Sequence, residues 1–381
     1  MKQRNEGQLT FWEASGIITG HGVGSGILSV PYLASRTGIF QTVLILCLSY
    51  AFSLLLHLLI AELSAANHGA QFVTCLKNDL FRGKKPFLTW FIFLMIGLSV
   101  LVNVVAFLEG AAAVFTSWLG LPHLFGMILF YFLSSLVVFA GLKSVGFFEK
   151  IAVALMTAIV CGLMLAVAGN GKSLAVPSSG DWKSCLALLS IVSFSLSAVM
   201  STPLVVKGLC FNPKRIRRAI AAGLFVNALL ISLITLVTLK GADTVTKNGA
   251  LVDLAESLGK GAGIAGYLFT LFALATSFWA NTLNMRDLMS EQTGLSPEKS
   301  FLFSSLPCLL AALPGLSTFV GFTRFAGIVQ VVTGLSVILA FNRSRKRTKK
   351  AEITGVFGSL PFQIAVVLFM LLASLGAVLR V

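Results

Sequence analysis

Residues 16–32 read GIITGHGVGSGILSVPY and place five glycines, His21 and Pro31 within one apolar stretch. Glycine and proline are the poorest helix formers, and a bilayer tolerates irregular backbone only where it lines a cavity or is buried in protein. A helix interrupted here would present N–H groups to an anion and carbonyl groups to a cation. His21 adds a side chain that can exchange a proton near neutral pH. The stretch therefore predicts an ion- and ligand-binding break, with tight packing of small residues as the alternative.

The composition indicates that such a break lies in a membrane. Of 381 residues, 56% are hydrophobic and 11% are charged, which is too apolar for a soluble chain of this length. The apolar runs do not alternate with polar residues as the strands of a β-barrel do. They predict an all-α integral membrane protein with about eleven transmembrane helices, at 11–34, 38–65, 87–117, 122–141, 147–169, 184–209, 215–240, 261–290, 299–317, 320–341 and 359–379.

The net charge of +15 is concentrated in short loops, which argues against a nucleic-acid partner and for orientation of the helices. With a cytoplasmic N-terminus, the inner side receives Lys77, Arg82, Lys84, Lys85, Lys143, Lys150, Lys214, Arg215, Arg217, Arg218 and the cluster at 342–350. We interpret that cluster as an orienting anchor; binding of anionic lipid or a partner is the alternative. The expected location is the plasma membrane, and specifically a bacterial inner membrane.

An internal repeat relates the first span to the sixth. Residues 25–31 read SGILSVP and residues 197–203 read SAVMSTP. Because five spans separate the two motifs, the halves of the chain would have opposite orientations in the membrane. Inverted repeats of this kind are typical of secondary transporters, whose sites lie between broken helices. We expect one transporter domain at 1–341, with repeats at about 11–169 and 184–341, and then a basic loop and eleventh helix at 342–381.

The same segments carry a family resemblance. GSGILSVPYLASRTG, at 24–38, resembles the first span of the amino acid/auxin permease family. VSFSLSAVMSTPLVVKGL and the following NPKRIRRAI resemble that family's sixth span and basic loop. The resemblance implies the superfamily of amino acid, polyamine and organocation transporters, with the five-plus-five inverted repeat of the leucine transporter and broken helices 1 and 6.

The resemblance also implies a substrate site. The N–H groups of Ser25 and Gly26 would bind an amino acid's carboxylate. Its ammonium group would meet the carbonyls of Gly22, Phe194 and Ser195, together with Ser197. The side-chain pocket would be formed by Phe194, Met200, Asn103 and Phe107.

A sodium site is implied by the pattern A-x-x-T-S in span 8. Ala273, Thr276 and Ser277 match it, and the carbonyls of Gly20 and Val23 would complete five oxygen ligands, as suits a hard cation. The alternative is that the two hydroxyls only bond to their own helix. A second sodium site is not expected, because Ile27 replaces an asparagine ligand and Asn227 is better explained as a bond between helices.

Proton coupling is the rival of sodium. Relatives that use protons place a lysine in the middle of span 5, whereas Lys150 lies at the cytoplasmic end of that span here. His21 is the possible proton site, with a neutral, hydrogen-bonded histidine as the alternative. Glu109 and Arg324 fall in the outer third of spans 3 and 10 and would form an outer gate; a structural pair, or snorkelling of each side chain, is the alternative. His57 and Glu62 are expected to pack or to snorkel, with no functional role.

These observations predict a cation-coupled secondary transporter of a neutral amino acid, working by alternating access, with sodium preferred over protons. The alternative is an amino-acid receptor of the same fold that binds without transport. An enzyme is not expected, since four histidines and few carboxylates form no catalytic cluster. The partners would be the substrate and the bilayer, with Na⁺ or H⁺ as coupling ion and no other cofactor.

Overall fold

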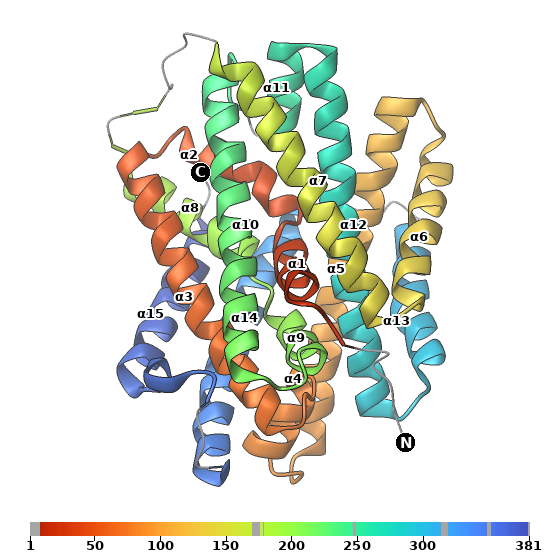
Figure 1. Cartoon of the computed structure of the whole chain (residues 1–381), viewed down its shortest axis with the longest axis vertical. Helices are drawn as coiled ribbons and strands as arrows, with labels where there is room; N and C mark the ends of the chain where they lie inside the picture. Colours follow the sequence, from red (N-terminus) through yellow and green to blue (C-terminus); the bar gives the residue numbers. More distant parts are fainter. Residues whose placement is uncertain are drawn as a thin grey trace.

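The computed structural model describes residues 8–169, 176–177, 179–246, 249–313, 319–348 and 352–379, with their side chains except at 25 and 319–333. All regular secondary structure in these ranges is helical. Seven helices of the described part, counting residues 182–208 as one, are long and apolar enough by themselves to cross a membrane. Figure 1 shows them as a bundle of long, mostly upright helices around the short α1 (Phe11–Gly22).

Each expected span corresponds to one helix or one interrupted helix. The first is α1 followed by η1 (Ser25–Ser29) and α2 (Val30–Ala34). The others are α3 (Ile39–Ala66), α5 (Pro86–Leu119), α6 (His123–Phe139), α7 (Leu142–Ala168), α8 (Trp182–Ser195) with η3 (Val199–Ser201) and α9 (Thr202–Gly208), α10 (Pro213–Gly241), α12 (Lys260–Thr293), α13 (Pro297–Ala312), α14 (Phe319–Thr348) and α15 (Leu360–Val378).

Both repeat motifs coincide with an interruption. In the first, Gly24 is extended (φ −60°, ψ −164°) and separates α1 from the 3₁₀ turn η1. In the second, Ala198 (φ −118°, ψ 27°) precedes the 3₁₀ turn η3. Pro31 and Pro203 then lie in the first turn of α2 and α9, where a proline costs no helical hydrogen bond. The expected broken helices 1 and 6 are therefore confirmed, and the shared motif encodes the same local geometry twice.

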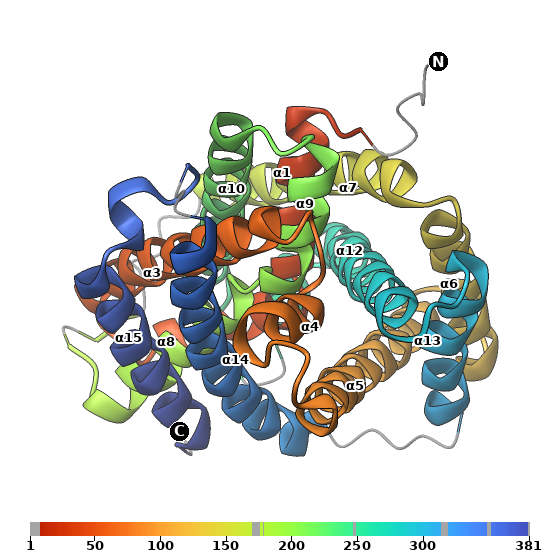
Figure 2. The same ribbon diagram turned by 90° about the horizontal axis from the view of Figure 1, so that it is seen from below.

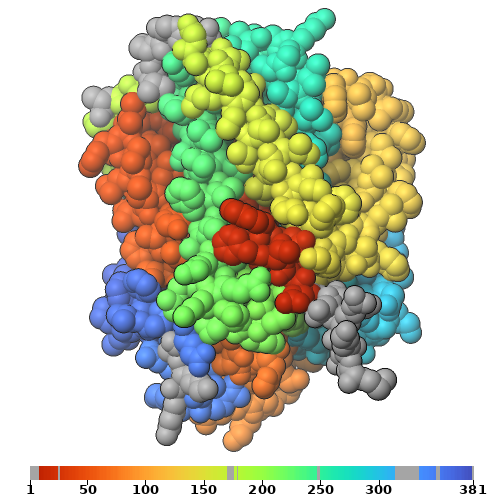
Figure 3. Space-filling view, in the orientation of Figure 1, coloured from red at the N-terminus to blue at the C-terminus, as the bar shows by residue number. Residues whose placement is uncertain are grey.

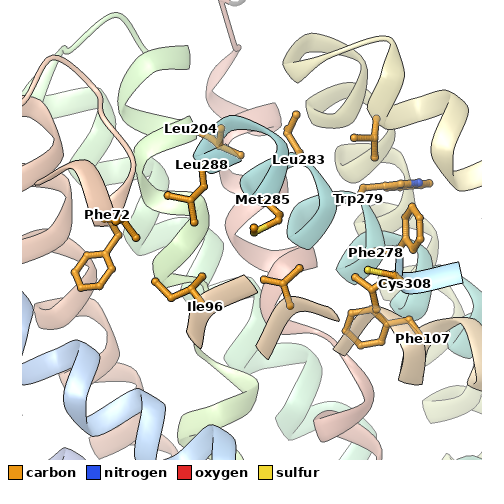
Figure 4. Close-up of a cluster of buried hydrophobic side chains, with 14 of the residues drawn as sticks. Phe72, Ile96, Phe107, Leu204, Phe278, Trp279, Leu283, Met285, Leu288 and Cys308 are labelled. Carbon is orange, nitrogen blue, oxygen red and sulfur yellow. The ribbon is translucent and has the colours of Figure 1, made fainter. Parts of the chain in front are cut away.

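The helices form two groups that meet at α1. In one group, α10 packs against α1 and α3, and α3 also packs against α8 and α9. In the other group, α5 packs against α6, α12 and α13. Viewed from below, α1 lies beside α7, α9 and α10, and the space-filling view shows its start seated between α7 and α9 (Figures 2 and 3). Buried side chains such as Phe107, Phe278 and Cys308 pack α5, α12 and α13 together (Figure 4).

The packing alternative holds for part of the glycine-rich stretch. A Cβ on Gly16 would lie 3.0 Å from the backbone nitrogen of Lys150, so Gly16 lets α1 approach α7 closely. Gly223 does the same for α10, because its Cβ would lie 2.6 Å from the Ser15 carbonyl oxygen. Glycines at the start of the stretch thus serve packing, and those after Thr19 line the break.

The basic cluster is a correction to the expected loop. The helix α14 continues to Thr348, so residues 342–348 extend the tenth span instead of forming a loop. Arginine and lysine are good helix formers, and Arg347 pairs with Asp79 at 3.1 Å. Glu62, expected to pack or to snorkel, accepts hydrogen bonds from the N–H groups of Ile353 and Thr354, both at 2.8 Å. The sequence analysis also missed the short helices α4 (Phe72–Cys75), η2 (Leu76–Leu80), α11 (Ala250–Leu258) and η4 (Gly355–Gly358).

Replacement of Gly376 by alanine is expected to destabilise the contact between α15 and α8. A Cβ there would lie 1.9 Å from the Leu186 carbonyl oxygen, and backbone atoms cannot move aside as a side chain can. Overpacking of this kind costs about 1–3 kcal/mol. The measurement is the unfolding midpoint in detergent. The matched control is Gly162→Ala on α7, where a Cβ meets nothing within 4 Å. Equal midpoints for the two variants would contradict this packing.

Candidate functional site

The two helix breaks lie against each other, which brings the predicted substrate residues together. A Cβ on Gly26 would lie 2.6 Å from Ser195 Oγ and 3.2 Å from Phe194 Cδ1. One on Gly22 would lie 2.7 Å from the Ser195 carbonyl oxygen. Any side chain at these two positions would therefore collide with the end of α8, and only glycine permits this closeness.

Two of the three carbonyls expected to bind an ammonium group, those of Ser195 and Phe194, already accept a hydrogen bond. The Ser195 carbonyl accepts from Asn227 Nδ2 at 2.7 Å, and the Phe194 carbonyl accepts from the Ser197 N–H at 3.0 Å. A carbonyl oxygen has two lone pairs, so each keeps the capacity for a second donor. The bond from Asn227 confirms its expected role between helices. Asn227 lies on α10 and is fully buried, so its hydrogen bond holds the C-terminal end of α8 against α10.

Two of the predicted cation residues on α12, Thr276 and Ser277, lie beside glycines of span 1. Gly24 faces Ser277, whose Oγ would lie 3.1 Å from a Cβ on the glycine, and Gly20 faces Thr276 Cβ at 2.9 Å. Thr276 Oγ1 donates to the Ala273 carbonyl at 3.0 Å, as the helix-bonding alternative expects. Ser277 Oγ is buried and has no hydrogen-bond partner among the described residues. Val23 is buried at the break itself.

Glu149 on α7 is the residue of this region that the sequence analysis missed. Its Oε2 would lie 1.7 Å from a Cβ on Gly20, so the carboxylate occupies the space that the glycine leaves open. The side chain is fully buried, and neither oxygen has a hydrogen-bond partner among the described residues. Span 5 was expected to begin at 147; because α7 begins at Leu142, Glu149 lies two turns inside the helix. The signal was present, as an acidic residue in an apolar run.

His21 joins three elements through hydrogen bonds. Its Nδ1 lies 2.6 Å from Ser201 Oγ on η3 and 3.4 Å from Asn284 Nδ2 on α12. Asn284 Nδ2 also donates to Ser201 Oγ at 2.9 Å. The Ser201 hydroxyl is therefore free to donate its proton to His21 Nδ1. The histidine is hydrogen-bonded as its alternative interpretation expected, although its partners are side chains and not carbonyls.

His57 stabilises the break of span 6, between α8 and η3, which is a role that the sequence analysis did not assign. Its Nδ1 lies 2.6 Å from the Ser53 carbonyl oxygen and must donate, because a carbonyl only accepts. Its Nε2 then accepts the N–H of Ala198 at 3.0 Å. This bond satisfies a backbone donor that the break between α8 and η3 leaves without a helical partner.

Replacement of His57 by leucine is expected to weaken substrate binding several-fold and to lower the unfolding midpoint. The change leaves the buried Ala198 N–H without an acceptor, at a cost of about 1–3 kcal/mol. Binding of radiolabelled substrate to the purified protein measures the effect. His68→Asn, at an exposed position whose left-handed backbone (φ 56°) asparagine tolerates, is the control. Wild-type affinity in His57→Leu would show that the second break does not depend on this bond.

The remaining predicted residues lie at the margins of the site. Phe107 Cε1 would be 4.0 Å from a Cβ on Gly24, at the edge of contact. Asn103 on α5 and Met200 on η3 are half-buried, and neither is among the atoms nearest to the glycines of the break. Glu109 contacts His123, with 3.3 Å between Oε2 and Nε2. The side chains of Arg324 and Ser25 lie outside the described residues.

Comparison with protein families identifies the chain's relatives. The model of the tryptophan/tyrosine permease family matches residues 8–376. The chain belongs to this family. The match supports a transporter family, and not specifically the amino acid/auxin permeases that spans 1 and 6 resemble. A search of curated proteins finds no significant match.

Solved transporters share the fold of this permease. One is Mhp1, a nucleobase-cation-symport-1 family transporter with bromovinylhydantoin bound. Its TM-score is 0.68 and its sequence identity is 12%, and the match covers 98% of this chain and 91% of Mhp1. Another is MhsT in complex with L-phenylalanine, with a TM-score of 0.61 and 14% identity. That match covers 98% of this chain and 100% of MhsT. The permease therefore has the leucine-transporter-like fold, in agreement with the expected fold class. Its relatives are transporters and not enzymes.

Proposed function

We propose that this permease is a secondary active transporter that carries an aromatic amino acid, of the tryptophan or tyrosine type, together with a cation. One observation carries the proposal: the breaks of spans 1 and 6 lie side by side, with Gly22 and Gly26 against Ser195 and Phe194. Paired half-helix ends supply N–H groups and carbonyls of opposite polarity, which is what a zwitterion needs. The family's name and the L-phenylalanine bound to MhsT support an aromatic side chain.

In this proposal the substrate's carboxylate binds the N–H groups of Ser25 and Gly26. Its ammonium group binds the carbonyls of Gly22, Phe194 and Ser195 and the Ser197 hydroxyl. The aromatic side chain lies toward Phe194, Phe107, Met200 and Asn103. Ser195 Oγ supports the assignment, because it is buried beside Gly26 without a hydrogen-bond partner in the described part of the chain.

Sodium is the proposed coupling ion. The carbonyls of Gly20, Val23 and Ala273 and the hydroxyls of Thr276 and Ser277 supply oxygen, which hard cations prefer. The buried Ser277 Oγ supports the site, since a hydroxyl without a partner is costly unless a ligand completes it. Proton coupling through His21 is the rival. We further propose a plasma-membrane location with a cytoplasmic N-terminus, and an outer gate between Glu109 and Arg324.

The proposal is tested by uptake of radiolabelled tryptophan, tyrosine and leucine into proteoliposomes. One batch has an inward sodium gradient and another has only an inward proton gradient. We expect sodium-driven accumulation of an aromatic substrate. Accumulation driven by protons alone would refute sodium coupling. Binding without accumulation under either gradient would favour the alternative, a receptor of the same fold.

A further inference from the structure

We propose that the Glu149 carboxylate is the charged ligand of the coupling-ion site between α1, α7 and α12. The inference rests on the proposed function, because it adds a residue to the same sodium site. The five ligands proposed from the sequence pattern are all neutral. A carboxylate beside them changes the chemistry, since the bound cation then neutralises a protein charge.

The carboxylate lies at this site by direct contact. Gly20, a proposed carbonyl ligand, lies so close to Glu149 that a Cβ would overlap Oε2 at 1.7 Å and Cδ at 2.7 Å. The same Cβ position lies 2.9 Å from Thr276 Cβ, so Glu149 and Thr276 border one glycine. Gly24, four residues further along the chain, faces Ser277. Gly20 therefore borders the carboxylate and Thr276, and Gly24 borders the hydroxyl of Ser277, the next residue of α12.

Nothing in the described part of the protein balances the charge of Glu149. Both carboxylate oxygens lack a hydrogen-bond donor, and none of the ion pairs among the described residues includes them. The two basic residues of α7 are engaged elsewhere: Lys150 Nζ lies 5.1 Å from the Phe147 ring centroid, and Lys143 pairs with Glu13 at 2.6 Å. A buried carboxyl group without a partner is strongly unfavourable as an anion, so it takes up either a proton or a cation. A bound cation supplies both the missing charge and the missing partner.

The unpartnered polar atoms of Glu149 and of Ser277 are two separate observations that both indicate a bound cation. Glu149 and Ser277 come from different helices, both are fully buried, and each has polar atoms without partners. One carboxylate with several neutral oxygens is a ligand set for a hard cation. Gly20 is then required at its position, because any side chain there would displace the carboxylate.

The test measures sodium binding directly, without transport. Purified protein is titrated with NaCl, with choline chloride keeping the ionic strength constant, and the unfolding midpoint is followed. A ligand that binds only the folded state raises the midpoint as its concentration rises. We expect sodium to raise the wild-type midpoint. In Glu149→Gln the shift should be lost, with sodium affinity at least about thirtyfold weaker, as for other losses of one partner from a buried charge pair.

Two further variants keep the result interpretable. Glu149→Asp retains the charge and should keep a weakened sodium response, whereas Lys150→Gln, the next residue along α7, should respond like wild type. Glu149→Gln should remain folded, since it removes an unpaired buried charge, and its midpoint in choline chloride checks this. A wild-type sodium response in Glu149→Gln would overturn the inference. If the wild type itself shows no sodium response, the proposed sodium coupling fails, and the inference fails with it.

Discussion

Replacement of Gly26 by valine is expected to abolish substrate binding and uptake. A Cβ at this position would lie 2.6 Å from Ser195 Oγ and 3.2 Å from Phe194 Cδ1, so the larger side chain would collide with the end of α8 and force the two breaks apart. The substrate's carboxylate is proposed to bind the N–H groups of Ser25 and Gly26, and the displaced backbone would no longer present them. Binding of radiolabelled tryptophan to purified protein, at concentrations up to about 1 mM, is the measurement.

Sodium binding separates a blocked site from a misfolded protein. Gly26 faces α8, whereas Gly20 faces α7 and α12 and Gly24 faces α12, so Gly26→Val should retain the sodium-dependent rise in unfolding midpoint. Gly162→Val, on an open part of α7, controls for the loss of a membrane glycine. Wild-type tryptophan affinity in Gly26→Val would contradict the placement of the substrate between the breaks.

Replacement of Ser277 by alanine is expected to raise the sodium concentration for half-maximal uptake about tenfold. Its hydroxyl is buried without a partner and faces Gly24, so the loss of the oxygen removes a proposed ligand and breaks no hydrogen bond of the described residues. A factor of ten corresponds to about 1.4 kcal/mol, which is within the range for one lost polar contact. Initial uptake rates at a series of sodium concentrations measure the change.

Thr270→Val on the same helix is the control for a lost hydroxyl. Thr270 Oγ1 donates to the Gly266 carbonyl at 2.9 Å, within its own helix. This variant should therefore keep the wild-type sodium dependence. If Ser277→Ala also keeps it, the hydroxyl is not an ion ligand and the site in α12 is wrong.

Much of the fold was predictable because local chemistry determines it. The apolar runs locate the spans to within a few residues, and the repeated S-x-x-x-S-x-P pattern marks both breaks, since it pairs a 3₁₀ turn with a proline-started helix. The continuation of α14 through 342–348 was not predicted. That helix depends on contacts with distant residues such as Asp79, which no local pattern reveals.

The site was predictable only in part, for a related reason. The glycines, Ser195 and Ser277 stand out because their type is unusual within an apolar helix. Glu149 was overlooked because its importance lies in what it meets on α1, and the expected start of span 5 placed it at the membrane edge. The acceptor role of His57 likewise exists only once α3 packs on the break of span 6.

A structure of the protein with L-tryptophan and sodium bound tests the central claim most directly. Our account predicts the amino acid between the two breaks, with its carboxylate at the Gly26 N–H and its ammonium group near the carbonyls of Phe194 and Ser195. A tryptophan bound elsewhere, with the space between Gly26 and Ser195 still closed, would contradict it.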